Sequence, residues 1–165
     1  MNNIPIKIQR NLYYDKRGAF SELYRASESE HNFVQDNLSI SRKNVLRGMY
    51  HQKTSTQGKL VTVISGSIQD IVVDVDPNSE HYGKHYEYNV KAGEAIWCPP
   101  NYLHGFLSLE DTILLYKCTD YYDPTGEVTV NAFDEKLNLP WRLTREEVIM
   151  SDKDSDGISF DEVLK

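Results

Sequence analysis

The sequence has few cysteines, no long hydrophobic run and no excess of basic residues. Its only two cysteines, Cys98 and Cys118, are too far apart for a C-x-x-C metal or redox motif. Each lies in an apolar run, so we expect two buried free thiols. Neither end resembles a signal peptide, and no apolar stretch is long enough to cross a bilayer. These absences argue against a disulfide-stapled or membrane protein, and we expect a cytoplasmic one.

The charge balance is acidic, with a formal net charge of -7 and a pI of about 5.2. Acidic residues are spread along the chain, so no basic surface is expected to bind nucleic acid or an anionic membrane. An anionic small ligand stays possible where the few Arg and Lys residues converge. The 165 residues, 39% of them hydrophobic, suit one globular domain over residues 1–165.

Alternation of apolar and polar residues dominates the chain. Residues 59–76, "KLVTVISGSIQDIVVDVD", alternate and are rich in Val and Ile, with Gly66 at the place of a turn. Residues 85–122 continue with short strand-like runs broken by Gly93, Pro99 and Pro100. This spacing predicts an all-β sandwich or barrel. Only residues 27–33 and the tail after Trp141 look helical or loose.

The acidic tail, residues 142–165, is expected to pack on or beside this domain. It contains "DKDSDGISFDEV", which begins like a calcium loop with Asp152, Asp154 and Asp156 at alternate positions. The twelfth residue should be a bidentate Glu and is Val163, while Glu162 falls one place early. We therefore predict a solvated acidic tail without a calcium site.

The stretch "GEAIWCPPNYLH" places Gly93, Pro99, Asn101 and His104 at the spacing of the second cupin motif. A metal-binding cupin also needs a His-x-His pair and a Glu in its first motif. The corresponding segment here, "YHQKTSTQGK", has one histidine and Lys59. A divalent metal needs more neutral or anionic ligands than this. The sequence resembles a cupin jelly-roll barrel for which we predict no required metal.

Ordered phrases along most of the chain resemble one cupin family, the nucleotide-sugar epimerases typified by dTDP-4-dehydrorhamnose 3,5-epimerase. These phrases include "DKRGAFSELY", "FVQDNLSISRKNVLRG", "PPNYLHGF", "LLYKCTDYYDP", "FDEKLNLPW" and "MSDKD". The resemblance implies an isomerase that forms a jelly-roll homodimer and uses no cofactor. It also implies a substrate in which the carbons flanking the 4-keto group of a nucleotide-linked 6-deoxyhexose are epimerised.

Epimerisation next to a ketone requires a base, a cation or donor for the enolate oxygen, and an acid on the opposite face. In the resembled family the base is the histidine of an R-G-L-H phrase that continues with an aromatic residue and Gln. Here the phrase reads "RGMYHQ", so Tyr50 holds the base position and His51 the place of the aromatic residue. On a regular strand His51 would point away from the barrel interior, although a β-bulge could turn it inward. Two hypotheses stay open, in which either His51 is the base or Tyr50 faces the pocket with a changed or absent activity.

The resemblance implies three further catalytic residues. Tyr116 in "LLYK" matches the acid that returns the proton, and Asp134 in "FDEKL" matches the carboxylate that orients the base. Lys59 in "QGKL" matches the residue beside the keto oxygen. The alternatives are a core tyrosine, a turn-capping aspartate and a surface lysine. His104 is expected in the pocket wall or in a structural role.

The nucleotide end needs Arg for the pyrophosphate and an aromatic face for the base. The resemblance matches nine positions to this role, and the dimer partner is expected to contribute three of them, Arg17, Phe20 and Glu22. The full set is Arg17, Phe20, Glu22, Gln35, Asn37, Arg47, His104, Tyr121 and Tyr122.

The sequence thus predicts an epimerase of a nucleotide-linked 4-keto-6-deoxysugar, with dTDP as the expected nucleotide, that inverts C3, C5 or both. We expect it to serve deoxysugar assembly for surface polysaccharide such as O-antigen or for a glycosylated product. A C3-only or C5-only epimerase, or a 3,4-ketoisomerase, is one alternative. A sugar-nucleotide binder without catalysis is the other.

Overall fold

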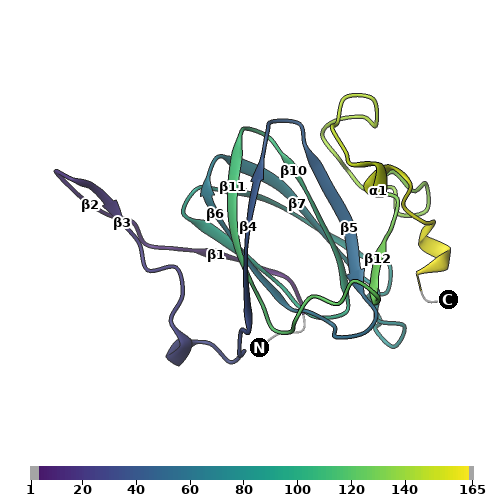
Figure 1. Cartoon of the computed structure of the whole chain (residues 1–165), viewed down its shortest axis with the longest axis horizontal. Helices are drawn as coiled ribbons and strands as arrows, with labels where there is room; N and C mark the ends of the chain where they lie inside the picture. The colour runs from purple at the N-terminus through teal and green to yellow at the C-terminus, as the bar shows by residue number, and fades with distance from the viewer. Residues whose placement is uncertain (1–3, 164–165) are drawn as a thin grey trace.

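Two five-stranded antiparallel sheets face each other and form the body of the molecule (Figure 1). The computed structural model describes residues 4–163. The strand orders are β1-β9-β6-β11-β4 in the first sheet and β12-β5-β10-β7-β8 in the second. The first sheet contains β1 (Ile6–Gln9), β4 (Gln35–Ser41), β6 (Lys59–Ser65), β9 (Glu94–Cys98) and β11 (Thr112–Cys118). The second contains β5 (Leu46–Gln52), β7 (Ser67–Asp74), β8 (His85–Lys91), β10 (Tyr102–Ser108) and β12 (Glu127–Thr129).

Strand β7 shows why the sheets form, because both of its faces are covered. Ile68 and Val72 face the first sheet and pack with Val61 and Leu114 between the two layers. On the other face, Ile71 and Val73 belong to a second core outside the second sheet. Each fully buried aliphatic side chain of this kind contributes about 1.5–3 kcal/mol to folding. The alternating pattern of residues 59–76 therefore gives two strands, β6 and β7, and the chain turns at Gly66, whose φ is +83°, to pass from the first sheet to the second.

The segment after Trp141 covers the outer face of the second sheet. The apolar side chains from Trp141 onward pack on the core outside the second sheet: Trp141, Leu143, Val148, Met150, Ile158, Phe160 and Val163. The helix α1 (Asp152–Ser155) lies beside β5 (Figure 1), and the 3₁₀ turn η2 (Phe160–Glu162) follows. The expectation of a solvated tail is wrong at Asp154, which is only 3% exposed.

A small hairpin, β2 (Tyr13–Asp15) with β3 (Gly18–Phe20), projects away from the two sheets (Figure 1). The 3₁₀ turn η1 (Ala26–Glu28) follows it. The hairpin exposes Tyr14 and Phe20, and β4 at the edge of the first sheet exposes Leu38 and Ile40. Each of these four side chains is between 65% and 76% exposed, which leaves two apolar surfaces uncovered in the single chain.

Two smaller predictions concern the cysteines and membrane spans. Cys98 and Cys118 are buried free thiols, as predicted. Over residues 4–163, no helix has the length and apolar character needed to cross a bilayer.

Candidate active site

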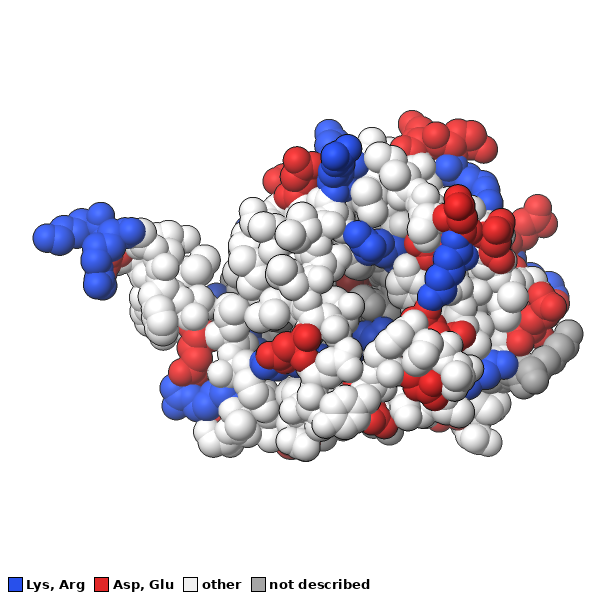
Figure 2. Space-filling model, viewed as in Figure 1, with Lys and Arg blue, Asp and Glu red and all other residues white. Residues whose placement is uncertain are grey.

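A cavity of about 470 Å³ opens between the two sheets, on the face shown in Figure 2. Its size falls in the range of small-molecule sites. Three of the ionisable side chains that line it are basic, Arg47, Lys59 and Lys153, and one is acidic, Glu127. The chain as a whole is acidic, so this local excess of positive charge makes the cavity suited to an anionic ligand.

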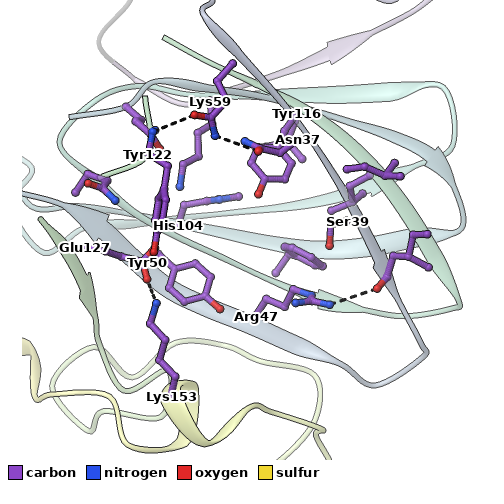
Figure 3. Close-up of a pocket in the computed structure, with 18 residues that line it drawn as sticks. Asn37, Ser39, Arg47, Tyr50, Lys59, His104, Tyr116, Tyr122, Glu127 and Lys153 are labelled. Atoms are coloured by element: carbon purple, nitrogen blue, oxygen red, sulfur yellow. Dashed lines mark hydrogen bonds and ion pairs between the residues drawn. The ribbon is translucent and has the colours of Figure 1, made fainter. Parts of the chain in front are cut away.

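The cavity has two walls, one from each sheet (Figure 3). Strands β6 and β11 contribute Lys59 and Tyr116 to one wall. Strands β5 and β10 contribute Tyr50 and His104 to the other. A ligand held between the walls is therefore approached by ionisable groups from two opposite sides.

A β-bulge in β5 decides which side chains reach this cavity. Tyr50 is opposite His104 and Arg47 is opposite Phe106, so three steps on β5 match two steps on β10. The bulge is built at Gly48, whose φ of +123° favours glycine. An extra residue reverses the alternation of side chains beyond it. Arg47 and Tyr50 therefore both line the cavity, although they are three residues apart.

Tyr50 is held by the segment after Trp141. Burial, and then the neighbouring carboxylate of Asp154, raise the pKa of Tyr50 above its ordinary value. Ser151 Oγ donates to Asp154 Oδ2 at 2.7 Å, while Oδ1 has no hydrogen bond of normal geometry with any residue in the described range. Lys153 Nζ lies 5.5 Å from the centre of the Tyr50 ring and pairs with Glu127. Tyr50 is thus a protonated phenol at neutral pH.

His51 does not line the large cavity. It is 8% exposed, and burial lowers its pKa, so the ring is neutral at pH 7. It borders a void of about 10 Å³ on one side and an outer depression near Asp76 and Asn78 on the other. The structure contradicts the hypothesis that a bulge turns His51 inward, because the bulge lies before Tyr50 and has the opposite effect.

His104 contacts a buried carboxylate inside the cavity wall. Its Nε2 lies 2.8 Å from Oδ2 of Asp70. Asp70 is fully buried, and His104 is 7% exposed. Asp70 lies on β7, next to β10 in the second sheet. The wall that carries Tyr50 therefore also carries a histidine oriented by a carboxylate.

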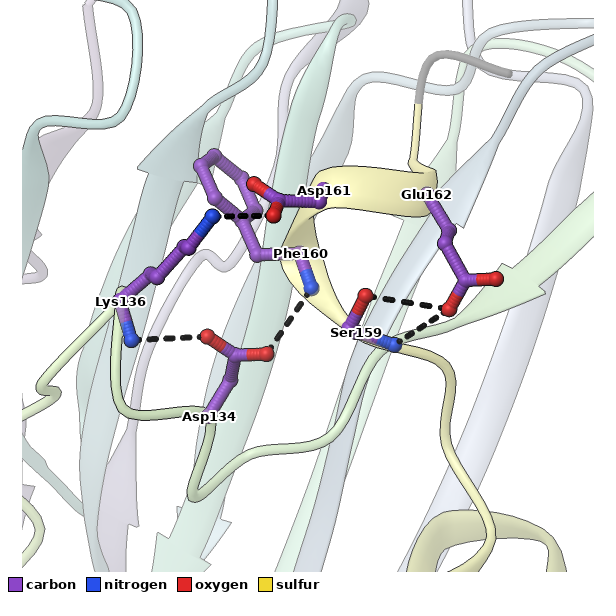
Figure 4. A network of polar contacts seen from close by, with 6 residues as sticks. All are labelled: Asp134, Lys136, Ser159, Phe160, Asp161 and Glu162. Atoms are coloured by element: carbon purple, nitrogen blue, oxygen red, sulfur yellow. Dashed lines mark hydrogen bonds and ion pairs between the residues drawn. The ribbon is translucent and has the colours of Figure 1, made fainter.

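Asp134 lies away from the cavity, in a loop that packs against the turn η2 (Figure 4). Its Oδ1 accepts from the backbone N–H of Lys136 at 2.9 Å, and its Oδ2 accepts from that of Phe160 at 3.0 Å. Lys136 also pairs with Asp161. The expectation that Asp134 orients the base is therefore corrected, because both of its oxygens cap backbone groups of the fold. Asp154 is the carboxylate that lies beside the base position.

Two other predicted catalytic residues, Lys59 and Tyr116, do line the cavity. Burial raises the pKa of Tyr116, which keeps its phenol protonated at neutral pH. Strands β6 and β11 pair, with Lys59 opposite Cys118 and Val61 opposite Tyr116. Lys59 and Tyr116 thus come from neighbouring strands and the same face of the first sheet.

The predicted nucleotide-binding residues divide into two groups. Gln35, Asn37, Arg47, His104 and Tyr122 line the cavity. Gln35 Oε1 accepts from the backbone N–H of Tyr122 at 3.0 Å, which fixes the aromatic residue at the rim. Tyr121 is 65% exposed and is not part of the lining.

The second group lies on or just after the projecting hairpin, outside this chain's own cavity. Arg17 pairs with Asp15 at 2.6 Å, and Glu22 pairs with Arg25 at 2.7 Å. Phe20 is 69% exposed. Nothing in the described part of this chain covers Phe20, and the single chain gives these residues no access to its cavity.

Sequence reasoning missed Asp70, Asp154, Glu127 and Lys153. Asp70 had a detectable signal, since it is an aspartate on the inward side of an otherwise apolar alternating run. Asp154 lies in "MSDKD", a phrase that resembles the family. Within residues 4–163, no three His, Cys, Asp or Glu side chains gather as a metal-binding cluster.

Comparison with known proteins agrees with this geometry. A family model described as dTDP-4-dehydrorhamnose 3,5-epimerase matches residues 5–162. The chain belongs to the dTDP-4-dehydrorhamnose 3,5-epimerase family. The Escherichia coli K12 member is 36% identical over 168 residues, covering 96% of this chain and 90% of the relative. The Methanothermobacter thermautotrophicus member is 36% identical over 158 residues, covering 90% and 85%.

Solved structures of the dTDP-4-dehydrorhamnose 3,5-epimerase family share the fold. A dTDP-6-deoxy-D-glucose-3,5-epimerase from Legionella pneumophila, in complex with dTDP-4-keto-L-rhamnose, has a TM-score of 0.91 and 34% identity. The match covers 96% of this chain and 89% of the Legionella pneumophila chain. A 3'-monoepimerase from Streptomyces bikiniensis in complex with dTDP-quinovose has a TM-score of 0.86 and 27% identity, covering 94% and 83%. The predictions of a cupin-type jelly roll and of an isomerase family are confirmed.

Proposed function

We propose that the protein removes a proton next to the keto group of a dTDP-linked 4-keto-6-deoxysugar and inverts C3, C5 or both. The observation that carries this proposal is the two-walled cavity, with Lys59 and Tyr116 on one side and Tyr50 and His104 on the other. Inversion needs proton removal on one face of the sugar and proton return on the other. The two opposing walls supply ionisable groups for both faces.

Lys59 and Tyr116 on the first wall, and Tyr50 on the second, each have a role that their chemistry supports. Lys59 is a cation for the keto oxygen, where negative charge develops when the proton leaves. Tyr116, kept protonated by burial, returns a proton to the face opposite the base. Tyr50, also a protonated phenol, acts in this proposal as a hydrogen-bond donor.

The nucleotide occupies the mouth of the cavity. Arg47 is a candidate for the pyrophosphate, since guanidinium forks match phosphate oxygens. Its Nε donates to Ser41 Oγ at 3.0 Å and leaves further donors available. Tyr122 offers an aromatic face for the base, with Gln35 and Asn37 beside it as polar partners. Relatives with bound dTDP-sugars support thymidine diphosphate as the carrier.

A single-site epimerase is the second candidate. The presence of Tyr50 at the position that the family gives to its catalytic histidine favours a changed outcome, and a 3'-monoepimerase is among the structural relatives. A 3,4-ketoisomerase and a binder without catalysis are the remaining alternatives.

The deciding experiment follows substrate protons by NMR in D2O. Incubation with dTDP-4-keto-6-deoxyglucose should place deuterium at C3 and C5 for a 3,5-epimerase and at one carbon for a single-site enzyme. Conversion to a 3-keto sugar would identify a ketoisomerase. Binding of the substrate without exchange would overturn the proposal in favour of a binder.

A homodimer is part of the proposal. The projecting hairpin and the β4 edge expose Tyr14, Phe20, Leu38 and Ile40, and a second copy would cover them. This arrangement would also bring Arg17 and Phe20 to the cavity of the partner.

Phe20→Asp should turn a dimer into a monomer in analytical ultracentrifugation. The matched control Tyr82→Asp, at a 41% exposed aromatic residue on the main body, should not. A monomeric wild type would refute the dimer.

The proposal places the enzyme in the cytoplasm, in deoxysugar supply for surface polysaccharide such as O-antigen. The nucleotide-linked type of substrate supports both points, because such sugars are activated intermediates of assembly.

A further inference from the structure

The base position of the cavity is held by a tyrosine, and this leaves the proton acceptor to be found. Burial raises the pKa of both Tyr50 and Tyr116, so neither is a phenolate at neutral pH. His51 is outside the cavity lining. Glu127, although in the lining, is paired with Lys153. His104 is the one histidine among the described residues that line the cavity.

We infer that His104, oriented by Asp70, is the general base of this protein. The inference rests on the proposed function and assigns one step of it. His104 is the direct antiparallel partner of Tyr50. Directly opposite side chains on neighbouring strands have Cβ atoms about 4.5–5.5 Å apart. A base at His104 therefore approaches the sugar from the same wall as a base at position 50 and keeps Tyr116 on the other face.

The contact with Asp70 fixes which ring nitrogen accepts the proton. An ionised carboxylate only accepts hydrogen bonds, so His104 Nε2 at 2.8 Å must carry a hydrogen. In the neutral ring Nδ1 is then the basic nitrogen. When Nδ1 takes up a proton, the ring becomes a cation beside a fully buried carboxylate, which is the arrangement that stabilises an imidazolium.

The other oxygen of that carboxylate strengthens the case. Asp70 Oδ1 is buried, and residues 4–163 offer it no hydrogen-bond partner. A buried carboxylate is costly unless it is paired, and His104 is its close cationic partner when protonated. The carboxylate therefore lies beside the ring that receives the proton, within hydrogen-bond distance of Nε2.

Epimerisation in this proposal takes two proton transfers. The bond between the sugar carbon and its hydrogen breaks, the proton moves to His104 Nδ1, and the electron pair forms the enolate with its charge on the oxygen beside Lys59. Tyr116 then gives its phenolic proton to the same carbon from the opposite face. Proton exchange with solvent restores Tyr116 and His104 for the next turnover.

The test measures deuterium uptake from D2O into dTDP-4-keto-6-deoxyglucose. His104→Asn should lower the exchange rate by roughly 10²–10⁴-fold, the range of a lost general base. Tyr50→Phe should lower it by less than about tenfold, since the phenol is not the acceptor. His85→Asn, on an exposed position of β8, is the matched control and should equal the wild type.

Two further measurements separate catalysis from folding. His104→Ala should regain exchange when imidazole is added, which a purely structural role would not allow. Asp70→Asn should lower kcat while leaving dTDP affinity, measured by calorimetry, unchanged. His104→Gln provides a second variant where the asparagine variant does not fold.

The outcomes distinguish the assignment from the proposed function. Wild-type exchange that persists in His104→Asn and disappears in Tyr50→Phe overturns the role of His104 and leaves the function standing. A wild type that binds dTDP and exchanges nothing overturns the function and the assignment together.

Discussion

Replacing Gly48 with alanine would test the bulge that aims Tyr50 into the cavity. An added Cβ would lie 2.6 Å from Cα of Gly105 and 2.9 Å from the carbonyl oxygen of His104. Both atoms belong to the backbone of β10, so neither can rotate away. The φ of +123° adds backbone strain, since side-chain-bearing residues rarely adopt it.

These two costs set the expected loss. Strain at such a backbone position costs about 1–3 kcal/mol, and overpacking a filled site costs about 1–3 kcal/mol. Gly48→Ala should therefore lower the free energy of unfolding by about 2–6 kcal/mol, a large share of the ~5–15 kcal/mol typical of a domain. Urea unfolding followed by circular dichroism gives this value, with the m-value checking that two-state behaviour is kept.

Gly83→Ala is the matched control for this loss. Gly83 also has a positive φ, +77°, but the nearest atoms to its added Cβ lie at 3.9 and 4.0 Å on the ring of Phe160. It should therefore show the backbone strain alone, at the low end of about 1–3 kcal/mol. Equal losses for the two variants, or a loss below about 1 kcal/mol for Gly48→Ala, would refute the close approach of β5 and β10.

Two further variants test the placement of individual side chains. Because burial lowers the pKa of His51, the unfolded chain takes up a proton below pH ~6.5 that the native state resists, so the free energy of unfolding falls as pH falls. His51→Gln should remove this part of the acid sensitivity, which amounts to up to about 1.4 kcal/mol per pH unit. Urea unfolding curves at pH 8 and pH 5 measure it. If the free energy of unfolding changes with pH as much in the variant as in the wild type, His51 lies in solvent. Tyr116→Phe should lower product formation by roughly 10²–10⁴-fold, while the base on the other wall continues to exchange deuterium into the substrate. If product formation and deuterium exchange fall by the same factor, Tyr116 is not the acid. Because its pKa is raised, wild-type product formation should not decline through ionisation of Tyr116 below pH ~10.

The β-rich fold and one wall of the cavity were predictable from the sequence. The alternation of residues 59–76 specified β6 and β7, and the phrases around Lys59 and Tyr116 brought both to the cavity. Such regular strands have a fixed side-chain period, so the sequence reports their faces directly.

The second wall was not predictable in the same way, because a bulge changes the period at one residue. The letters "RGMYHQ" permit either Tyr50 or His51 to face inward, and only the pairing of β5 with β10 decides between them. Asp154 was missed for a different reason. Its contact with Tyr50 joins residues far apart in the chain, and its neighbours resembled a solvated acidic run. Asp134 was misassigned because a turn-capping aspartate and a catalytic one look alike in sequence.

The docking of α1 beside β5 also gives the site an order in time. Asp154 is 104 residues beyond Tyr50 (154 minus 50), so a ribosome adding about 5–20 residues per second makes it roughly 5–20 seconds later. All ten strands of the two sheets are complete in the chain before α1 is synthesised. The residues of both sheets, including His104 and Asp70, are therefore synthesised before Asp154, and the cavity acquires its final electrostatics only when α1 docks beside β5.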